Sequence, residues 1–282
     1  MDYFDLHCDT AYECYKRNLD LNNRNLAVNN DFGDVFNNWK QCFAIWIKDD
    51  IKAPFELYKK ILNNFKKLQK RNNLTPIMTV EGGAVIEDKT ERIDQLKNDG
   101  ISALTLTWNG ENRIGGGAFS DAPLTDFGRA VINRLNKNKM FCDLSHINEK
   151  GFYKAIEIAD YPFASHSCCR AICDHKRNLY DEQLKLIAQK NGVIGICFYP
   201  IFLGGQNVFE KIYENIYHML LLDLENSICI GSDFDGAEMS DELKNISAIP
   251  KLYGYLSSRG INDKSLNKIF YTNADNFFFD KR

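Results

Sequence analysis

Short apolar stretches rich in β-branched and aromatic residues recur along the chain, and segments with helical periodicity separate them. This alternation of strand and helix favours a parallel sheet with helices packed outside it. Eight repeats in one chain favour a closed (β/α)₈ barrel, a TIM barrel, over an open doubly wound sheet. The predicted strands are Tyr3–Leu6, Cys42–Ile47, Pro76–Val80, Ala103–Thr107, Met140–Leu144, Pro162–Ala164, Val193–Phe198 and Ile228–Ile230.

Three of the intervening helices have recognisable starts. Thr125 and Asn148 are residue types that cap helix N-termini, and each precedes a run with an apolar face. Asp181 opens a third helix, which we expect to stop at Asn191-Gly192.

Two segments depart from the repeat. Residues 17–38 are polar and rich in Asn, and they are expected to form a loop insertion after the first strand. Residues 109–123 form a Gly-rich stretch after the fourth strand. It lacks the Gly-Lys-Ser/Thr ending of a phosphate-binding loop, so we do not interpret it as one.

Length and composition narrow the class of protein. A chain of 282 residues with 44% apolar content suits one barrel, so we predict a single domain over residues 1–282. The net charge of −3 argues against a nucleic-acid partner, because binding to phosphates needs a basic surplus.

The sequence indicates a protein of a reducing compartment. Its nine cysteines are an odd number, without a CxxC pair, and the cluster Cys168, Cys169 and Cys173 is most simply a set of free thiols. The first residues lack a basic start and an apolar core, and no apolar run approaches the roughly 18 residues of a membrane span. We therefore expect a soluble cytoplasmic protein without a membrane partner.

Ionisable residues gather where the predicted strands end. Side chains alternate along a strand, so His7 and Asp9 point the same way and Cys8 points away. A His-x-Asp triplet alone seldom binds anything. Further ionisable residues follow the third, fifth, sixth and eighth strands, at the barrel face where catalysis takes place in such enzymes. They are Glu81, His146, His166 and Asp233.

Imidazole and carboxylate ligands suit zinc, and their number suits two ions. His7 and Asp9 are expected on one ion and His146 and His166 on the other, with Glu81 between them. Two metals about 3.5–4 Å apart share a water and lower its pKa toward about 7. Asp233 would then carry a proton from that water to the leaving group.

The same residues form a pattern that resembles the membrane (renal) dipeptidase family, peptidase family M19, from about residue 5 to 275. The combined pattern is specific, although each piece of it is not. Its pieces are His7-x-Asp9, Glu81-Gly82-Gly83, Asp143-Leu144-Ser145-His146, Ser165-His166-Ser167, Arg177-Asn178 and Asp233-Phe234-Asp235-Gly236.

The resemblance implies a barrel of the metal-dependent hydrolase type with two zinc ions, which hydrolyses dipeptides and forms a homodimer. It assigns the metals to His7, Asp9, Glu81, His146 and His166, and proton transfer to Asp233. It implies that Arg177, of the Arg177-Asn178 pair, grips the C-terminal carboxylate of the substrate, a task that suits the guanidinium fork. Tyr199 matches a tyrosine of the substrate site.

Three departures from the family pattern bear on function. Trp108 stands where animal members have a His that steadies the oxyanion, and an indole donates one hydrogen bond but carries no positive charge. Asn109, Asn112 or the metals would then do more. Asn273 stands in a Tyr-Thr-Asn sequence instead of Gly-x-Asn, so we expect it to be structural. The secretion signal and lipid-anchor tail of the animal members are not seen, as in a soluble prokaryotic-type member.

Two alternatives to a zinc-dependent dipeptidase remain. The first is another amidohydrolase reaction on the same metals, such as deacylation of an N-acyl amino acid or opening of a lactone, which Trp108 and the Gly-rich loop motivate. The second is a catalytically weak barrel kept for binding, which has no need for a full set of metal ligands. A purely structural barrel requires the placement of these residues to be chance.

Overall fold

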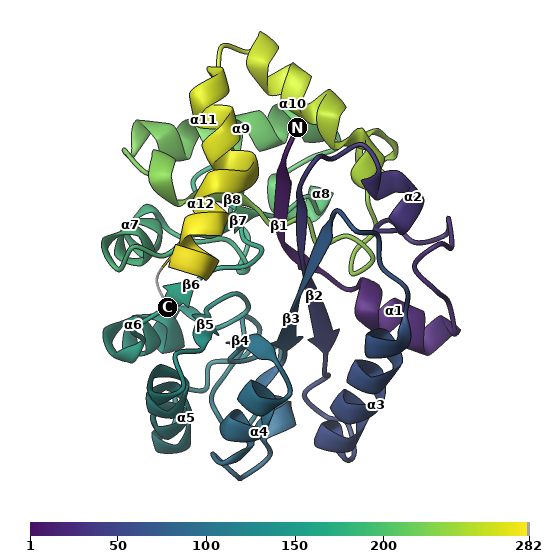
Figure 1. Cartoon of the computed structure of the whole chain (residues 1–282). Helices are drawn as coiled ribbons and strands as arrows, with labels where there is room; N and C mark the ends of the chain where they lie inside the picture. The colour runs from purple at the N-terminus through teal and green to yellow at the C-terminus, as the bar shows by residue number, and fades with distance from the viewer. Residues whose placement is uncertain (281–282) are drawn as a thin grey trace.

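Eight parallel strands form the centre of the computed structural model, which describes residues 1–280, and helices surround them (Figure 1). Hydrogen-bonded neighbours run in the order β6-β5-β4-β3-β2-β1-β8-β7. The ring closes at Ala164, whose N–H donates to the Val193 carbonyl at 3.0 Å and whose carbonyl accepts from Gly195 N–H at 2.8 Å. The predicted (β/α)₈ barrel is therefore confirmed. The strands are β1 Tyr3–Cys8, β2 Trp39–Trp46, β3 Leu74–Glu81, β4 Ile101–Thr105, β5 Phe141–Asp143, β6 Pro162–Phe163, β7 Ile194–Ile196 and β8 Ile228–Ile230.

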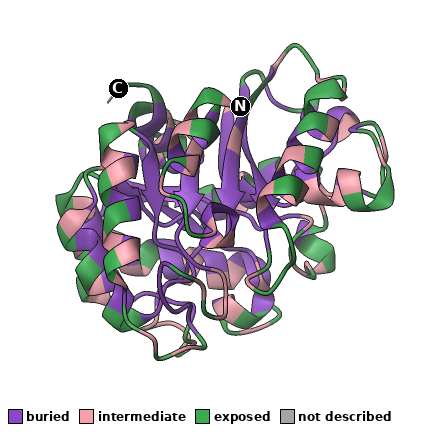
Figure 2. Ribbon diagram, turned by 90° about the horizontal axis from the view of Figure 1, so that it is seen from below, coloured by how far each residue is buried: buried purple, intermediate pink, exposed green. Residues whose placement is uncertain are grey.

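The helices alternate with the strands and cover the outside of the barrel, where buried faces meet the sheet and exposed faces meet solvent (Figure 2). The α-helices are α1 Thr10–Arg17, α2 Asn30–Gly33, α3 Pro54–Lys67, α4 Arg92–Asn98, α5 Asp126–Lys137, α6 Glu149–Ile158, α7 Asp181–Gln189, α8 Pro200–Leu203, α9 Val208–Leu221, α10 Ile249–Ser258, α11 Asp263–Asn267 and α12 Asn273–Asp275. Shorter helical turns are Gly83–Ile86, Glu225–Ser227, Asp241–Leu243, Ile246–Ala248, Lys268–Thr272 and Asn276–Asp280.

The predicted helix starts are confirmed by their caps. The Thr125 side chain accepts from Gly128 N–H at 2.9 Å, and the Asn148 side chain accepts from Gly151 N–H at 2.7 Å. Helix α7 begins at Asp181, and the chain turns away after it with Asn191 in the left-handed region at φ 55°.

The loop insertion predicted over residues 17–38 contains one short helix, α2. Asn29 starts this helix by accepting from Phe32 N–H at 3.0 Å. The predicted strands were also too long at the ends of β4 and β7. There the backbone leaves the regular ladder, and Phe198 N–H reaches across to the Ser232 carbonyl at 3.2 Å.

Large apolar side chains fill the amino-terminal part of the barrel. Phe141 of β5 packs against Phe277 and Phe278 of the C-terminal segment, with ring centroids 4.6 and 4.5 Å apart. Asn273 fixes that segment by donating to the carbonyls of Glu225 and Ile228, both at 2.8 Å, which is the structural role expected of it. These rings close the middle of the barrel at its amino-terminal end.

No helix among the described residues is long and apolar enough to cross a membrane. All nine cysteines lie in the described part of the chain and are free. Burial raises the pKa of the Cys168 thiol to about 12, so it is protonated at neutral pH.

Candidate metal centre

The ionisable residues predicted at the strand ends lie together over the carboxyl end of the barrel. His7 lies near the end of β1, Glu81 ends β3, and His146, His166 and Asp233 follow β5, β6 and β8. Asp9, the N-cap residue of α1, completes the group. All six are at most 9% exposed. Burying this many ionisable groups together is costly unless they are paired or bind a cation.

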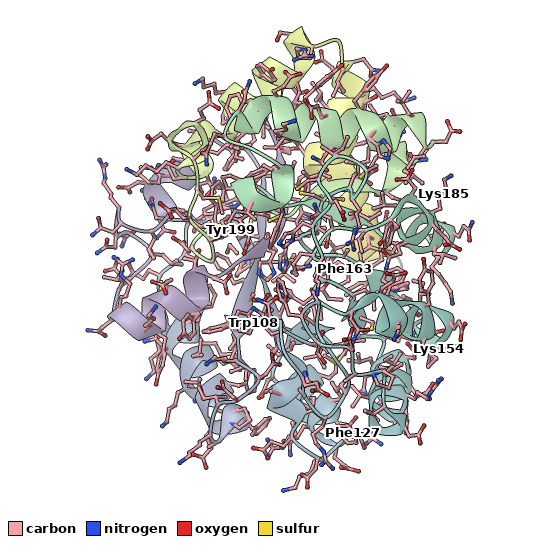
Figure 3. The ribbon with its side chains drawn as sticks, turned by 180° about the vertical axis from the view of Figure 1, so that it is seen from behind. Trp108, Phe127, Lys154, Phe163, Lys185 and Tyr199 are labelled. Carbon is pink, nitrogen blue, oxygen red and sulfur yellow. The ribbon has the colours of Figure 1, made fainter. Side chains whose placement is uncertain are left out.

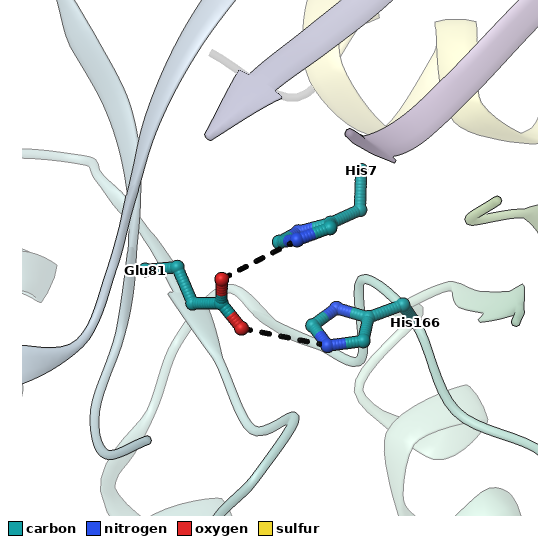
Figure 4. A group of neighbouring side chains, drawn as sticks. All are labelled: His7, Glu81 and His166. Carbon is teal, nitrogen blue, oxygen red and sulfur yellow. Dashed lines mark ion pairs between the residues drawn. The ribbon is translucent and has the colours of Figure 1, made fainter. Parts of the chain in front are cut away.

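Glu81 divides the cluster into two halves (Figure 4). Its Oε2 atom lies 3.5 Å from His7 Nε2, which is also 3.5 Å from Asp9 Oδ2. Its Oε1 atom lies 2.8 Å from His146 Nε2 and 3.6 Å from His166 Nε2. One carboxylate thus faces a His-Asp pair with one oxygen and a His-His pair with the other, as a carboxylate that bridges two cations would.

The Nε2 atoms of the second half have lone pairs directed at the centre, because the other ring nitrogens meet hydrogen-bond acceptors. Asn109 Oδ1 lies 2.9 Å from His146 Nδ1. Ser165 Oγ lies 2.8 Å from His166 Nδ1 and donates to Asp143 Oδ2 at 2.7 Å, so it accepts from the ring. An outer partner of this kind fixes the tautomer of a metal-binding His.

His7 shows most directly that the site fits a cation. Its Nε2 atom is buried and has no hydrogen-bond partner among the described residues, although carboxylate oxygens surround it. Ligand atoms of His7, Glu81 and His166 all lie within 4.8 Å of one another, and so do those of His7, Asp9 and Asp233. Asp233 Oδ1 is 3.9 Å from His7 Nε2, so it borders the His7 half. The donor set suits zinc or a similar borderline ion.

The pKa shifts indicate an excess of negative charge around His7. Although burial opposes its protonation, Glu81 and Asp9 raise the pKa of His7 well above its usual range. Burial and the neighbouring Glu81 raise the pKa of Asp9 to about 6. Burial raises the pKa of Asp233 to about 7, against the opposing effect of His7. In the other half, burial and Arg177 lower the pKa of His146 to about 4, so its ring is neutral and available as a ligand.

The backbone is strained where it presents these side chains. His146 has φ 69° and Asp233 has φ 64°, in the left-handed region that residues other than Gly seldom adopt. Such outliers persist where surrounding contacts enforce them, and they gather at functional sites. Gly82, next to Glu81, has φ 107°, and a Cβ there would lie 2.1 Å from the Ile47 carbonyl oxygen. Glycine therefore permits the turn that places Glu81.

A cavity of about 430 Å³ opens above the cluster, and Trp108 and Tyr199 line it. Both residues are labelled in Figure 3, where Tyr199 lies above Trp108. The volume is within the usual range for small-molecule sites.

Arg177 and Asn178 do not line this cavity. Arg177 is 3% exposed and lies behind His166, whose carbonyl accepts from its Nη2 at 3.2 Å, while its Nε has no partner among the described residues. It is near enough for Glu81 and Asp233 to raise its pKa, although burial lowers that pKa overall. Asn178 donates to the carbonyls of Cys173 and Phe202, at 2.9 and 2.8 Å, so its visible contacts join two loops.

Sequence reasoning assigned no role to several side chains that organise the site. Asp143 accepts four hydrogen bonds, from the backbone N–H groups of Ser145 and Ser165 and from the hydroxyls of Thr105 and Ser165. Asp235 accepts from Thr10 at 2.5 Å and from Ala27 N–H at 2.7 Å, which ties the segment before α2 to the end of β8. Both carboxylates lie in the quoted motifs, and their position at strand ends was the available signal.

The fold and the cluster together define a metal-dependent hydrolase of the TIM-barrel type. The sequence model of the membrane dipeptidase family, peptidase family M19, matches residues 46–277. The chain therefore belongs to this family and is a metallo-dipeptidase.

Two curated relatives are similar to this chain in sequence, and one of them is described as a dipeptidase. An uncharacterized protein in the pqqA 5′ region of Klebsiella pneumoniae is 30% identical over 215 residues, which are 71% of this chain and 79% of the relative. An uncharacterized dipeptidase of Schizosaccharomyces pombe is 28% identical over 71% of this chain and 51% of its own length.

Two solved structures share the fold over nearly the whole chain. A metallo peptidase from Rhodobacter sphaeroides, liganded with a phosphinate mimic of the dipeptide L-Ala-D-Ala, superimposes with a TM-score of 0.86 at 19% identity. The comparison covers 99% of this chain and 98% of that one. The dipeptidase AC, of family M19, has a TM-score of 0.85 at 20% identity, with the same coverage.

Proposed function

We propose that this chain hydrolyses dipeptides with a free C-terminal carboxylate, and that it does so with two zinc ions. The observation that carries the proposal is the division of the site by Glu81, whose two oxygens face two separate ligand sets. His7 and Asp9 would hold one ion, and His146 and His166 the other. When bound, the ions supply Lewis acidity and lower the pKa of water, which makes a nucleophile available near neutral pH.

In this mechanism Asp233 handles the proton. It lies beside His7 and lines the cavity, so its carboxylate faces the space above the proposed metal ligands. Asp233 would accept a proton from the attacking water and deliver it to the nitrogen of the leaving amine.

We assign Arg177 to the substrate carboxylate from the family pattern, and its unpartnered Nε, behind His166, is the donor available for that role. Asn178 holds the loop that carries Arg177, and Tyr199 and Trp108 form walls of the site.

A glutamine at position 81 tests the metal assignment. Glu81→Gln keeps the size of the side chain but removes one of the two oxygens and the charge. We expect it to lose bound zinc, measured by elemental analysis, together with dipeptidase activity. A variant with full zinc content and full rate would refute the assignment of Glu81 as the bridging ligand.

The second candidate is hydrolysis of an N-acyl amino acid or a lactone on the same metals, and the departure from the family pattern at Trp108 motivates it. A panel of dipeptides, N-acyl amino acids and lactones separates the two. Faster turnover of the dipeptides supports the proposal, and turnover confined to one of the other classes rejects it.

A further inference from the structure

Three aromatic side chains in successive contact line one side of the cavity. They are Tyr12, Trp46 and Trp108, and we call them the aromatic wall. The rings of Tyr12 and Trp46 meet edge to face, with centroids 5.0 Å apart at 87°. Those of Trp46 and Trp108 lie 5.1 Å apart at 71°. All three line the cavity and are only partly buried, so they present free ring surface to whatever occupies it.

The inner end of the wall reaches the metal centre. Trp108 lies 6.3 Å from the ring of His146, measured between centroids. The outer end is formed by α1, where Glu13 pairs with Lys16 at 3.1 Å and with Arg17 at 3.6 Å. Glu13 and Lys16 also line the cavity, and Lys16 Nζ lies 5.6 Å from the centre of the Tyr12 ring. A charged pair therefore borders the outer end of the wall, and its uncovered aromatic surface lies mainly on Trp46 and Trp108.

The wall and the proposed carboxylate site lie on opposite halves of the barrel. Tyr12, Trp46 and Trp108 belong to α1, the end of β2 and the loop after β4. Arg177 follows β6, and its guanidinium lies 5.2 Å from the ring of Phe202, which follows β7. A dipeptide with its carboxylate toward Arg177 and its peptide bond over Glu81 therefore directs its N-terminal residue toward the wall.

We infer that the aromatic wall binds the side chain of the N-terminal residue of the substrate and selects large aromatic or apolar side chains there. The inference rests on the proposed dipeptidase function and specifies its substrate class. Flat rings favour an aromatic guest in edge-to-face or offset contact, and the area removed from water adds to that preference.

The test measures kcat/KM for two series, Xaa-Gly and Gly-Xaa, with Ala, Phe, Lys and Asp as Xaa. We expect zinc-loaded wild type to prefer Phe-Gly to Ala-Gly by about tenfold or more, which corresponds to about 1.4 kcal/mol. Trp46→Ala should reduce this ratio at least about fivefold, and Tyr12→Ala should lower it in the same direction. The ratio of Gly-Phe to Gly-Ala should stay the same in both variants.

Tyr217→Ala is the matched control, because this tyrosine of α9 is 48% exposed and does not line the cavity. It should leave the Phe-Gly to Ala-Gly ratio unchanged. Zinc content is measured for every variant, and Tyr12→Ala, on a partly exposed helix, preserves the test if Trp46→Ala fails to fold.

A second readout does not depend on turnover. Two of the three tryptophans belong to the wall, so dipeptide binding to metal-free protein should change the intrinsic fluorescence. Phe-Gly should bind more tightly than Ala-Gly by this measure, and equal Kd values would contradict the inference.

If dipeptides are hydrolysed but the Phe-Gly to Ala-Gly ratio is unchanged in both wall variants, the inference is refuted and the proposed function stands. A change confined to the Gly-Xaa series has the same meaning. Failure of zinc-loaded wild type to cleave any dipeptide refutes the proposed function, and the inference with it.

Discussion

The hydroxyl of Ser165 offers a direct test of how the protein fixes its metal ligands. Ser165 Oγ lies 2.8 Å from His166 Nδ1 and 2.7 Å from Asp143 Oδ2, and all three residues are buried. Ser165→Ala removes the acceptor of the His166 ring N–H. Asp143 Oδ2 keeps its bond from Thr105, at 2.6 Å. The loss therefore falls mainly on the orientation of the imidazole.

The size of the effect expected for Ser165→Ala follows from these contacts. A buried donor left without a partner costs about 1–3 kcal/mol, so the metal-free variant should lose about that much free energy of unfolding in urea. Loss of an outer partner of a ligand lowers metal affinity roughly 10- to 100-fold. The ion held by His146 and His166 should weaken more than the other, because Ser165 Oγ lies 2.8 Å from His166 Nδ1 but 3.4 Å from His7 Nδ1.

The assay is a zinc titration against a competing chelator. The matched control is Ser167→Ala, two residues further on, because Ser167 Oγ is also buried but has no hydrogen-bond partner among the described residues. We expect Ser165→Ala to weaken zinc binding, with the larger loss at the ion held by His146 and His166, and Ser167→Ala to weaken neither ion. Unchanged zinc affinity in Ser165→Ala, or an equal loss in both variants, would refute the reasoning.

Three other substitutions separate stability, metal binding and substrate binding. Asn273→Ala removes hydrogen bonds to the carbonyls of Glu225, before β8, and Ile228, at its start, so urea unfolding should show a loss of about 1–3 kcal/mol with kcat unchanged. A fall in kcat at full zinc content would contradict the structural role. Gly236→Ala places a methyl group 2.1 Å from Asp9 Oδ2 and 2.7 Å from Asp233 Oδ1, so zinc content and activity should fall while circular dichroism stays native. Full activity would show that these carboxylates are not needed where they lie. Arg177→Lys should lower kcat/KM for free-acid dipeptides about 10- to 100-fold, because a charge-assisted hydrogen bond contributes about 1.5–3 kcal/mol. The kcat/KM for dipeptides with an amidated C-terminus should barely change. An equal loss of kcat/KM for free-acid and amidated dipeptides would show that Arg177 does not bind the substrate carboxylate.

The barrel was predictable because its strands carry a strong apolar signal and its helices carry capping residues. Strand alternation predicted that His7 and Asp9 share a side. The structure places His7 Nε2 3.5 Å from both Asp9 and Glu81, although Asp9 lies just beyond the strand as the N-cap of α1. Helix α2 was missed because the Asn residues that indicated a loop include Asn29, whose side chain caps it. Local composition does not distinguish these two uses of Asn.

The hydrogen bonds that orient the metal-binding residues could not be predicted from the sequence for a different reason. The bonds from Ser165 to Asp143 and from His146 to Asn109 join residues 22 and 37 positions apart. A motif shows that such side chains are present, but their pairing depends on how neighbouring strands of the barrel are aligned. The aromatic wall is similar, since its three rings come from separate repeats.

The most direct test of the central claim is amine release from L-L and L-D dipeptides by the zinc-loaded protein, before and after chelation and after zinc is restored. We predict cleavage with two zinc ions bound per chain, loss of cleavage on chelation, and recovery when zinc is added. Cleavage that survives complete removal of the metal, or no cleavage of any dipeptide at full zinc occupancy, would contradict the account.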